Sequence, residues 1–302
     1  MSGDRPTTPA PHGEADVAGD PELVEAYLHR IGLDRAGPAD ADLLRTLQER
    51  HLKTVPFENI DFHLGEPIRL GRPAVEKVVR RRRGGTCREL NGSAFPTLLR
   101  GLGYRVTLLG SRVFLDGRPS FPLAHTVIRV DCPEPYLVDV GFGRDGALRP
   151  LRMDLRGPQP DPHGTFEFVE TPEGELDLLR NGTTVLRIEP QPRHVEDFLP
   201  VLWWFESSPR SPFRTSLFCT RATDEGRVTL RGDLLTHTRG TRRSRTVLPD
   251  EAAIHQAYAE HFGITLDRLP PIPGRAPAAE TGPSRGDRTA TATLRPFASE
   301  RT

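Results

Sequence analysis

The sequence has few of the features that mark secreted, disulfide-rich or membrane-spanning proteins. Its 302 residues include three cysteines, an odd number that does not form a disulfide framework. Lysine is rare, since Lys53 and Lys77 leave arginine as 39 of the 41 basic residues. No apolar run approaches the roughly 20 residues of a membrane span, and the first 20 residues lack the apolar segment of a signal peptide. We therefore expect a reduced, cytoplasmic protein that has no membrane partner.

Positive and negative charges balance in this chain, with 41 basic and 41 acidic residues. A net charge of zero gives no overall attraction to nucleic acid or to an anionic membrane, so we expect neither as a partner. A chain of this length can bury a substantial core, divided over two or three domains. The preference for arginine over lysine suggests a GC-rich bacterial genome.

Apolar residues at helical spacing dominate the first third of the chain. We expect a disordered leader over residues 1–20 and a helical domain over residues 21–102. Its first three helices should begin near Pro21, Asp40 and Pro73, because proline and aspartate favour helix starts.

Beyond Gly103 the pattern changes to short β-type runs separated by turn residues. Strands are predicted at residues 104–110, 112–115, 125–130, 136–140, 165–169, 176–180 and 183–188. Their even spacing indicates an antiparallel sheet or barrel over residues 103–194. A helix over 195–205 should open an interdomain segment, 195–215. Strands at 216–219 and 227–230 and a helix near 250–261 should make up a last unit over 216–271, and we expect a flexible tail over 272–302.

The segment from Arg80 to Asn91, Arg-Arg-Arg-Arg-Gly-Gly-Thr-Cys-Arg-Glu-Leu-Asn, favours a reactive thiol at Cys87. Neighbouring cations and a helix N-terminus both lower the pKa of a thiol from its usual value of about 8.5. The residues after Cys87 have helical spacing, with Pro96 tolerated only in the first turns or at a kink. The alternative is an inert buried cysteine beside a basic surface, because free cysteine often behaves as a small hydrophobe.

A cysteine nucleophile requires a base and a group that orients the base. Among ten histidines, His125 opens an apolar strand, and Asp139 lies within the next predicted strand. Residues of matching parity on paired strands point to the same face. A carboxylate in such an apolar run should be buried and in need of a partner, which His125 would supply. The alternatives are a turn-forming aspartate before Gly141 and a histidine of the core or of a sheet edge.

The order of these residues resembles that of the arylamine N-acetyltransferases, which use a Cys-His-Asp triad and acetyl-coenzyme A. The resemblance extends from about Val24 to about Leu269. It rests on the landmarks Ala26-Tyr-Leu-His-Arg-Ile-Gly, Val55-Pro-Phe-Glu-Asn, Arg83-Gly-Gly-Thr-Cys, His125 followed by Asp139-Val-Gly-Phe-Gly-Arg, Ser208-Pro-Arg-Ser-Pro-Phe and Leu235-Thr-His.

The resemblance implies an α+β fold with a helical N-terminal domain carrying a papain-like cysteine site, a central antiparallel β-barrel and a C-terminal α/β lid. It implies that Cys87 accepts the acyl group, that His125 is its base and that Asp139 orients the histidine, with no metal. The acceptor amine would contact Phe57, Thr86, Val113 and Phe142. The coenzyme would approach Trp204, Ser208, Ser211 and Phe213.

The implied reaction is acetyl transfer from acetyl-CoA to an arylamine or hydrazine, by a ping-pong mechanism through an acyl-Cys87 intermediate. We further expect Arg82 and Arg83 to stabilise the cysteine loop through carboxylates such as Glu58, the alternative being a solvated basic face. Cys132 and Cys219 are interpreted as structural.

Two residues depart from the family pattern on either side of the cysteine. Thr86 stands where relatives have an aromatic residue, and Arg88 stands where an aromatic or aliphatic residue is usual. Both flank the nucleophile, so they affect the expected acyl and acceptor preference before they affect the triad. One alternative is an amide synthase of natural-product biosynthesis, which takes a polyketide acyl group from an acyl carrier protein. A thiol hydrolase would use the same three residues with water as acceptor, and a non-catalytic binding module would keep only the fold.

Overall fold

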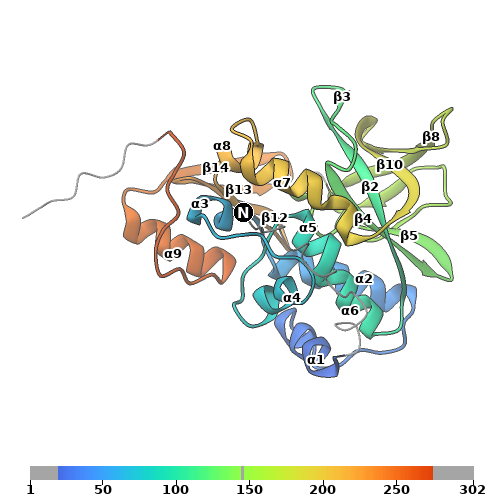
Figure 1. Cartoon of the computed structure of the whole chain (residues 1–302), viewed down its shortest axis with the longest axis horizontal. Coiled ribbons are helices and arrows are strands. Elements are labelled where there is room, and N and C mark those ends of the chain that lie inside the picture. Colours follow the sequence, from blue (N-terminus) through green and yellow to red (C-terminus); the bar gives the residue numbers. More distant parts are fainter. Residues whose placement is uncertain (1–19, 144–145, 275–302) are drawn as a thin grey trace, which may run out of the picture.

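The computed structural model describes residues 20–143 and 146–274. Most of the predicted leader and tail, residues 1–19 and 275–302, lies outside the described residues. The described chain forms a group of N-terminal helices, a β-barrel and a C-terminal sheet with one long helix (Figure 1). This arrangement confirms the predicted α+β class. None of the helices in the described part is both long and apolar enough to span a membrane.

Aspartate side chains begin the first two helices. Asp20 accepts hydrogen bonds from backbone N–H groups of the first turn of α1, and Asp40 does so for α2, which satisfies groups that have no partner inside the helix. Asp20 therefore belongs to α1 rather than to a leader. The apolar stripes of these helices pack into one core with α4. The N-terminal helices are α1 (Pro21–Arg30), α2 (Ala41–Thr54), α3 (Ile60–Leu64) and α4 (Arg72–Val79).

The cysteine segment is one continuous helical stretch that contains a π-helical turn. It consists of α5 (Cys87–Glu89), η2 (Leu90–Ala94) and α6 (Phe95–Gly101). Pro96 has no N–H to donate, and its ring crowds the preceding turn. Immediately before it, the N–H of Phe95 bonds to the carbonyl of Leu90 five residues back, which widens the helix. The helix predicted after Cys87 is thus confirmed, with its irregularity next to the proline.

In the described chain the barrel is a nine-stranded antiparallel sheet. Its strands run in the order β6-β5-β4-β2-β10-β9-β8-β7, with β3 paired to β2. Gln159 connects the two edges: its Oε1 accepts from the N–H of Arg152, and its Nε2 donates to the Arg152 carbonyl. The barrel is therefore nearly closed around an apolar interior. The strands are β2 (Arg105–Leu115), β3 (Arg118–Pro119), β4 (His125–Cys132), β5 (Glu134–Val138), β6 (Leu151–Arg152), β7 (Gln159–Asp161), β8 (Gly164–Glu170), β9 (Leu176–Arg180) and β10 (Thr183–Arg193).

Two strand predictions in this region are wrong in detail. The runs at 104–110 and 112–115 form one strand, β2, which continues through Gly110. A Cβ at Gly110 would lie 2.3 Å from the Leu123 side chain, so this glycine allows close packing and does not mark a turn. Asp139 lies just after β5 rather than inside it. Its Oδ1 accepts the N–H of Gly141, and this local turn ends the strand.

The C-terminal part is a five-stranded sheet, ordered β1-β11-β12-β13-β14 within the described residues, with α9 packed on one face. Strand β1 comes from the N-terminal third and pairs Phe57 with Thr220. The sequence patterns missed β13 and β14, because they are rich in threonine and arginine and every residue of β14 is exposed. The elements after the barrel are η4 (Val195–Phe198), α7 (Leu199–Ser207), α8 (Pro212–Thr215), β11 (Phe218–Thr223), β12 (Gly226–Arg231), β13 (Leu234–Arg239), β14 (Arg242–Val247) and α9 (Glu251–Phe262), with β1 at Phe57–Glu58.

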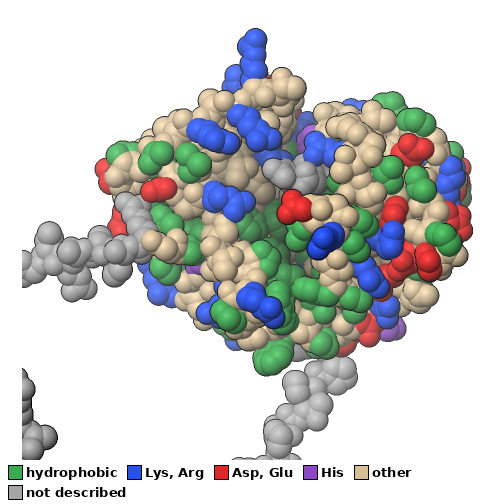
Figure 2. All heavy atoms as spheres, turned by 90° about the horizontal axis from the view of Figure 1, so that it is seen from above, with side chains coloured by type: hydrophobic (Ala, Val, Ile, Leu, Met, Phe, Trp, Pro, Cys, Tyr) green, Lys and Arg blue, Asp and Glu red, His purple; other side chains and the backbone are tan. Residues whose placement is uncertain are grey.

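The face that includes α7 and α8 carries side chains of both charges and is hollowed near its middle, where hydrophobic side chains are visible (Figure 2). The cysteine helix α5 lies beside β4 (Figure 1), and Gly85 just before this helix bridges to Phe57 of β1. The fold therefore brings residues from all three parts of the chain to one place.

Candidate active site

Cys87, His125 and Asp139 come from different elements and meet at one end of the barrel. Cys87 is the first residue of α5, His125 begins β4, and Asp139 follows the neighbouring antiparallel strand β5. All three side chains are buried. Nε2 of His125 lies 2.7 Å from Oδ2 of Asp139, and the imidazole and the Cys87 thiol are near enough for each to shift the pKa of the other. Because Asp139 occupies Nε2, Nδ1 is the ring nitrogen left for the sulfur.

Asn91 holds the carboxylate of this group, and the sequence analysis assigned it no role. Its Nδ2 donates to Oδ1 of Asp139 at 2.6 Å and to the carbonyl of Thr126 at 2.7 Å. Its Oδ1 accepts the backbone N–H of Val140. Asn91 thus ties the cysteine helix to both strands. The available signal was its spacing, since the fourth residue after Cys87 lies on the same helix face.

The charges around the sulfur favour the ionised thiol. Burial alone raises the pKa of the Cys87 thiol, but the charges of Arg88 and His125, with hydrogen bonds from His125 and the Thr126 backbone, lower it to about 7. Burial also lowers the pKa of His125, and the negative charges of Asp139 and Cys87 outweigh that effect and raise it to about 10. Near neutral pH this pair is therefore a thiolate beside an imidazolium, the reactive form of a cysteine nucleophile.

Arg88 is the arginine that touches the sulfur. Its Nη1 lies 3.3 Å from Sγ of Cys87, and its Nη2 donates to the carbonyls of Leu123 and Ala124 at 3.0 Å each. The expectation that the arginines before the cysteine act on the thiol is not met in this geometry. Arg80 and Arg81 form exposed ion pairs with glutamates, while Arg88, after the cysteine, is 1% exposed.

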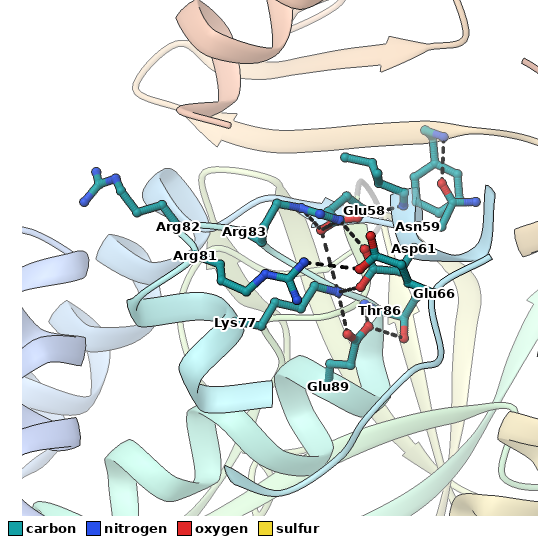
Figure 3. Close-up of polar contacts among 12 residues, drawn as sticks. Glu58, Asn59, Asp61, Glu66, Lys77, Arg81, Arg82, Arg83, Thr86 and Glu89 are labelled. Carbon is teal, nitrogen blue, oxygen red and sulfur yellow. Dashed lines mark hydrogen bonds and ion pairs between the residues drawn. The ribbon is translucent and has the colours of Figure 1, made fainter. Parts of the chain in front are cut away.

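A buried network of ion pairs lies beneath the cysteine loop (Figure 3). Arg83 donates to Glu58 at 3.0 Å and to Asp61 at 2.7 Å, and Lys77 contacts Asp61 and Glu89 at 2.6 Å each. The predicted contact between Arg83 and Glu58 is confirmed. The Arg82 side chain is exposed and points away from these carboxylates (Figure 3).

Thr86 takes part in this network through the start of α5. Its side chain and that of Glu89 form a capping box, in which the carboxylate of Glu89 accepts the N–H of Thr86 at 2.8 Å. Thr86 is fully buried, so its hydroxyl fixes the helix start that carries Cys87. This geometry gives Thr86 a structural contact at the start of α5.

The other residues predicted to contact the acceptor lie around the histidine and the cysteine loop. The ring of Phe142 is 4.9 Å from that of His125, and Phe142 and Val113 pack against the same apolar cluster of the barrel. Phe57 bridges to Gly85 beside the cysteine. Phe142 therefore lies beside the histidine and Phe57 beside the cysteine loop, whereas Val113 belongs to the barrel cluster.

The residues predicted to approach the coenzyme lie on and after α7. The Phe213 ring is 4.8 Å from that of Phe205 and 6.4 Å from that of Phe57. Trp204 contacts Phe205, over whose ring the Arg88 guanidinium lies. Ser208 ends α7, and the buried Ser211 caps α8. An aromatic cluster thus links this segment to the cysteine loop.

Metal-binding geometry is not found among residues 20–143 and 146–274, where no three His, Cys, Asp or Glu side chains gather as ligands would. Cys132 and Cys219 are buried free thiols outside the candidate triad. The candidate site that the described residues form is a buried cysteine beside a histidine and a carboxylate.

Known proteins resemble this chain over most of its length. A family model described as N-acetyltransferase matches residues 40–270. The arylamine N-acetyltransferase of Mycobacterium tuberculosis is 36% identical over 254 residues, covering 80% of this chain and 89% of the relative. That of Escherichia coli is 32% identical over 255 residues, covering 81% and 90%.

Solved structures of similar proteins share the fold. The arylamine N-acetyltransferase of Salmonella typhimurium superposes with a TM-score of 0.75 at 29% identity, covering 80% of this chain and 91% of that one. The enzyme of Mycobacterium marinum in complex with CoA gives a TM-score of 0.72 at 31% identity, covering 80% and 92%.

Proposed function

Because this chain belongs to the arylamine N-acetyltransferase family and is therefore an acyltransferase, we propose that it moves an acetyl group from acetyl-CoA to an arylamine or hydrazine through an acyl-Cys87 intermediate. The observation that carries the proposal is the buried group of Cys87, His125 and Asp139, in which His125 is hydrogen-bonded to Asp139 and lies beside the thiol. A buried thiolate next to an imidazolium is suited to attack a thioester, because the sulfur is already deprotonated.

In the first half-reaction the Cys87 thiolate attacks the thioester carbonyl of acetyl-CoA. A new bond forms between Sγ and the acetyl carbon, the bond to the coenzyme sulfur breaks, and the His125 imidazolium gives its proton to the departing thiolate. Asp139 holds the imidazole by the contact at Nε2, so Nδ1 faces the reacting sulfur atoms. CoA then leaves as the free thiol.

In the second half-reaction the amine attacks the acetyl-Cys87 carbonyl. The bond between nitrogen and the acetyl carbon forms, the amine gives a proton to neutral His125, and Sγ leaves as a thiolate. The enzyme returns to its thiolate–imidazolium form and the product is an amide. We assign Phe57, Val113 and Phe142 to the acceptor side, and Trp204, Ser208, Ser211 and Phe213 to the donor side.

The proposed functional units are the helical domain 21–102, the barrel 103–194, the connection 195–215 and the lid 216–271. The cysteine comes from the first unit, and the histidine and carboxylate come from the second. We also propose a cytoplasmic location, which is consistent with all three cysteines being free thiols.

The test is mass spectrometry of the protein after incubation with acetyl-CoA. We expect one added acetyl group on Cys87, which aniline or a hydrazine discharges as the corresponding amide. Cys87→Ser should take up no thioester-linked acetyl group and lose turnover, while the control Cys132→Ser should behave as the unsubstituted protein. An adduct lost rapidly in buffer alone would point to hydrolysis instead. Acylation only by a carrier-bound thioester would point to the amide synthase.

A further inference from the structure

Arg88 has an unusual electrostatic position for a buried residue. Its side chain is 1% exposed, and among the described residues no carboxylate lies within ion-pair distance of it. Burying a cation without an anionic partner is costly, which is why buried arginines normally pair with Asp or Glu. The negative group that Arg88 contacts is the Cys87 sulfur, 3.3 Å from Nη1.

We propose that Arg88 is a fourth catalytic side chain, which holds Cys87 as a thiolate by direct contact with Sγ. The thiolate then persists even when His125 carries no positive charge. This inference rests on Cys87 being the nucleophile of the proposed reaction, and it adds a charge that the Cys-His-Asp arrangement does not contain. It also gives a role to the residue by which this chain departs from the family pattern.

Three further contacts fix the guanidinium next to the sulfur. Nη2 donates to the carbonyls of Leu123 and Ala124, and the guanidinium carbon lies 4.5 Å from the centroid of the Phe205 ring. Such a stack holds a planar guanidinium in place. The remaining nitrogen, Nε, is buried and has no hydrogen-bond partner in the described part of the chain. The cation is therefore held in one orientation, with Nη1 at the sulfur.

The charges around Sγ come from a short list of groups. Arg88 from α5 and His125 from β4 are positive, and Asp139 after β5 is negative and faces the far side of the imidazole. A backbone hydrogen bond from Thr126 adds to them. With Arg88 included, the thiolate, imidazolium, carboxylate and guanidinium sum to zero, whereas the triad alone would carry one net negative charge. A buried site without net charge is easier to form.

The same contact acts in both half-reactions. Before acylation it raises the fraction of thiolate at neutral pH. In the second half-reaction the bond between the acetyl carbon and Sγ breaks, and the sulfur that receives the electron pair is again next to the guanidinium. A lower thiol pKa makes sulfur a better leaving group, although each thiolate becomes a weaker nucleophile.

The test measures the pH dependence of Cys87 alkylation by iodoacetamide, which requires no turnover. Arg88→Met retains the length and apolar packing of the side chain but removes its charge. We expect the midpoint pH of alkylation to rise by about one unit, which slows alkylation about tenfold below the midpoint. Arg88→Lys should recover part of the shift. Arg81→Met removes an exposed arginine of the same loop, paired with Glu66, and should change nothing.

A second variant leaves Arg88 in place and tests the same claim. In His125→Asn the midpoint should stay below the ordinary thiol value of about 8.5, because the guanidinium still contacts the sulfur. A midpoint at or above that value would overturn the proposal, as would an unchanged midpoint in folded Arg88→Met. Iodoacetate adds a check on charge: its alkylation rate relative to iodoacetamide should fall in Arg88→Met and not in Arg81→Met. Failure of acetyl transfer with these shifts intact would overturn only the proposed function.

Discussion

The side-chain amide of Asn91 lies 2.6 Å from Oδ1 of Asp139, on the opposite carboxylate oxygen from the one that faces His125. The carboxylate is therefore held from two sides, by the helix that carries the cysteine and by the histidine that it orients. Asn91 also bonds to the backbone of Thr126 in β4 and of Val140 after β5. One side chain therefore sets the distance between the nucleophile and its base.

Asn91→Ala should remove this control and lower activity. Without the amide, the Thr126 carbonyl and the Val140 N–H lose partners, and Asp139 can rotate away from His125. A shift of about 1 Å at a catalytic group can cost about a hundredfold in rate, so we expect kcat to fall by that order. The matched control is Thr97→Val on the same helix, which also removes a buried hydrogen bond. Equal losses in both variants would show a general effect on the helix.

The pH dependence of acylation should report the thiol. The pKa of Cys87 is lowered to about 7, so the thiolate is lost as pH falls through that value, and the acylation rate should fall with it. The pKa of His125 is raised to about 10, so the imidazolium persists up to that pH. We expect release of CoA in a single turnover to rise through pH 7 and to level off before pH 10. Because Cys87 and His125 interact, each midpoint of the pH profile describes the titration of the two groups together. A midpoint near 9 would contradict the thiolate form.

Deacetylation should depend on the protonation state of His125 rather than on that of Cys87. Once Cys87 is acetylated, its negative charge no longer raises the pKa of His125, and only Asp139 continues to do so. The histidine that accepts the amine proton must be neutral. We therefore expect the pKa of His125 in the acetyl-enzyme to lie below its value in the free enzyme. NMR titration of the His125 ring in both forms measures the difference, and an unchanged or higher value would contradict it.

The sequence allowed much of the fold to be predicted where one residue type dictates a local structure. Pro21 begins α1, Asp40 caps α2, Pro96 sits at the irregular turn, and the apolar strands of the barrel appear at the expected places. Strands β13 and β14 could not be predicted in this way. Their polar residues show no alternation, and their hydrogen bonds with neighbouring strands define them.

The candidate triad could be named from the order of motifs, but its supporting contacts could not. The hydrogen bonds that hold Asn91 and Arg88 in place reach residues 35 positions or more away in the chain, at Thr126, Asp139 and Leu123. Their partners depend on how α5 meets the end of β5 and the loop before β4. Whether an arginine acts on a thiol depends on the direction of its side chain. Arg80 to Arg83 lie near Cys87 in the sequence, but in the structure their side chains point elsewhere.

The ion-pair network beneath the loop should be necessary for stability. Lys77 is buried and contacts Asp61 and Glu89 at 2.6 Å each, with Glu58 also near. Lys77→Met would leave Arg83 as the cation for Glu58 and Asp61, and would leave Glu89 without an ion-pair partner among the described residues. Removing one partner of a buried ion pair typically costs about 3–5 kcal/mol of unfolding free energy, and we expect a loss of that order in urea denaturation. Arg72→Met, which removes an exposed arginine of the same helix, should have little effect.

Gly141→Ala should disable the site while disturbing the fold less than Lys77→Met does. A Cβ at Gly141 would lie 2.7 Å from Cα of Cys87 and 3.1 Å from Nδ2 of Asn91, so the added methyl group must push the cysteine helix away from the loop that carries Asp139. Because the first of these contacts is with backbone, a side-chain rotation cannot relieve it. We expect acetylation of Cys87 to slow by about a hundredfold, by the same argument from misplacement. Gly37→Ala has open space around its Cβ and serves as the control. Normal acetylation in Gly141→Ala would mean that the loop can retreat without moving Asp139, and the close approach of these two segments would then have no part in catalysis.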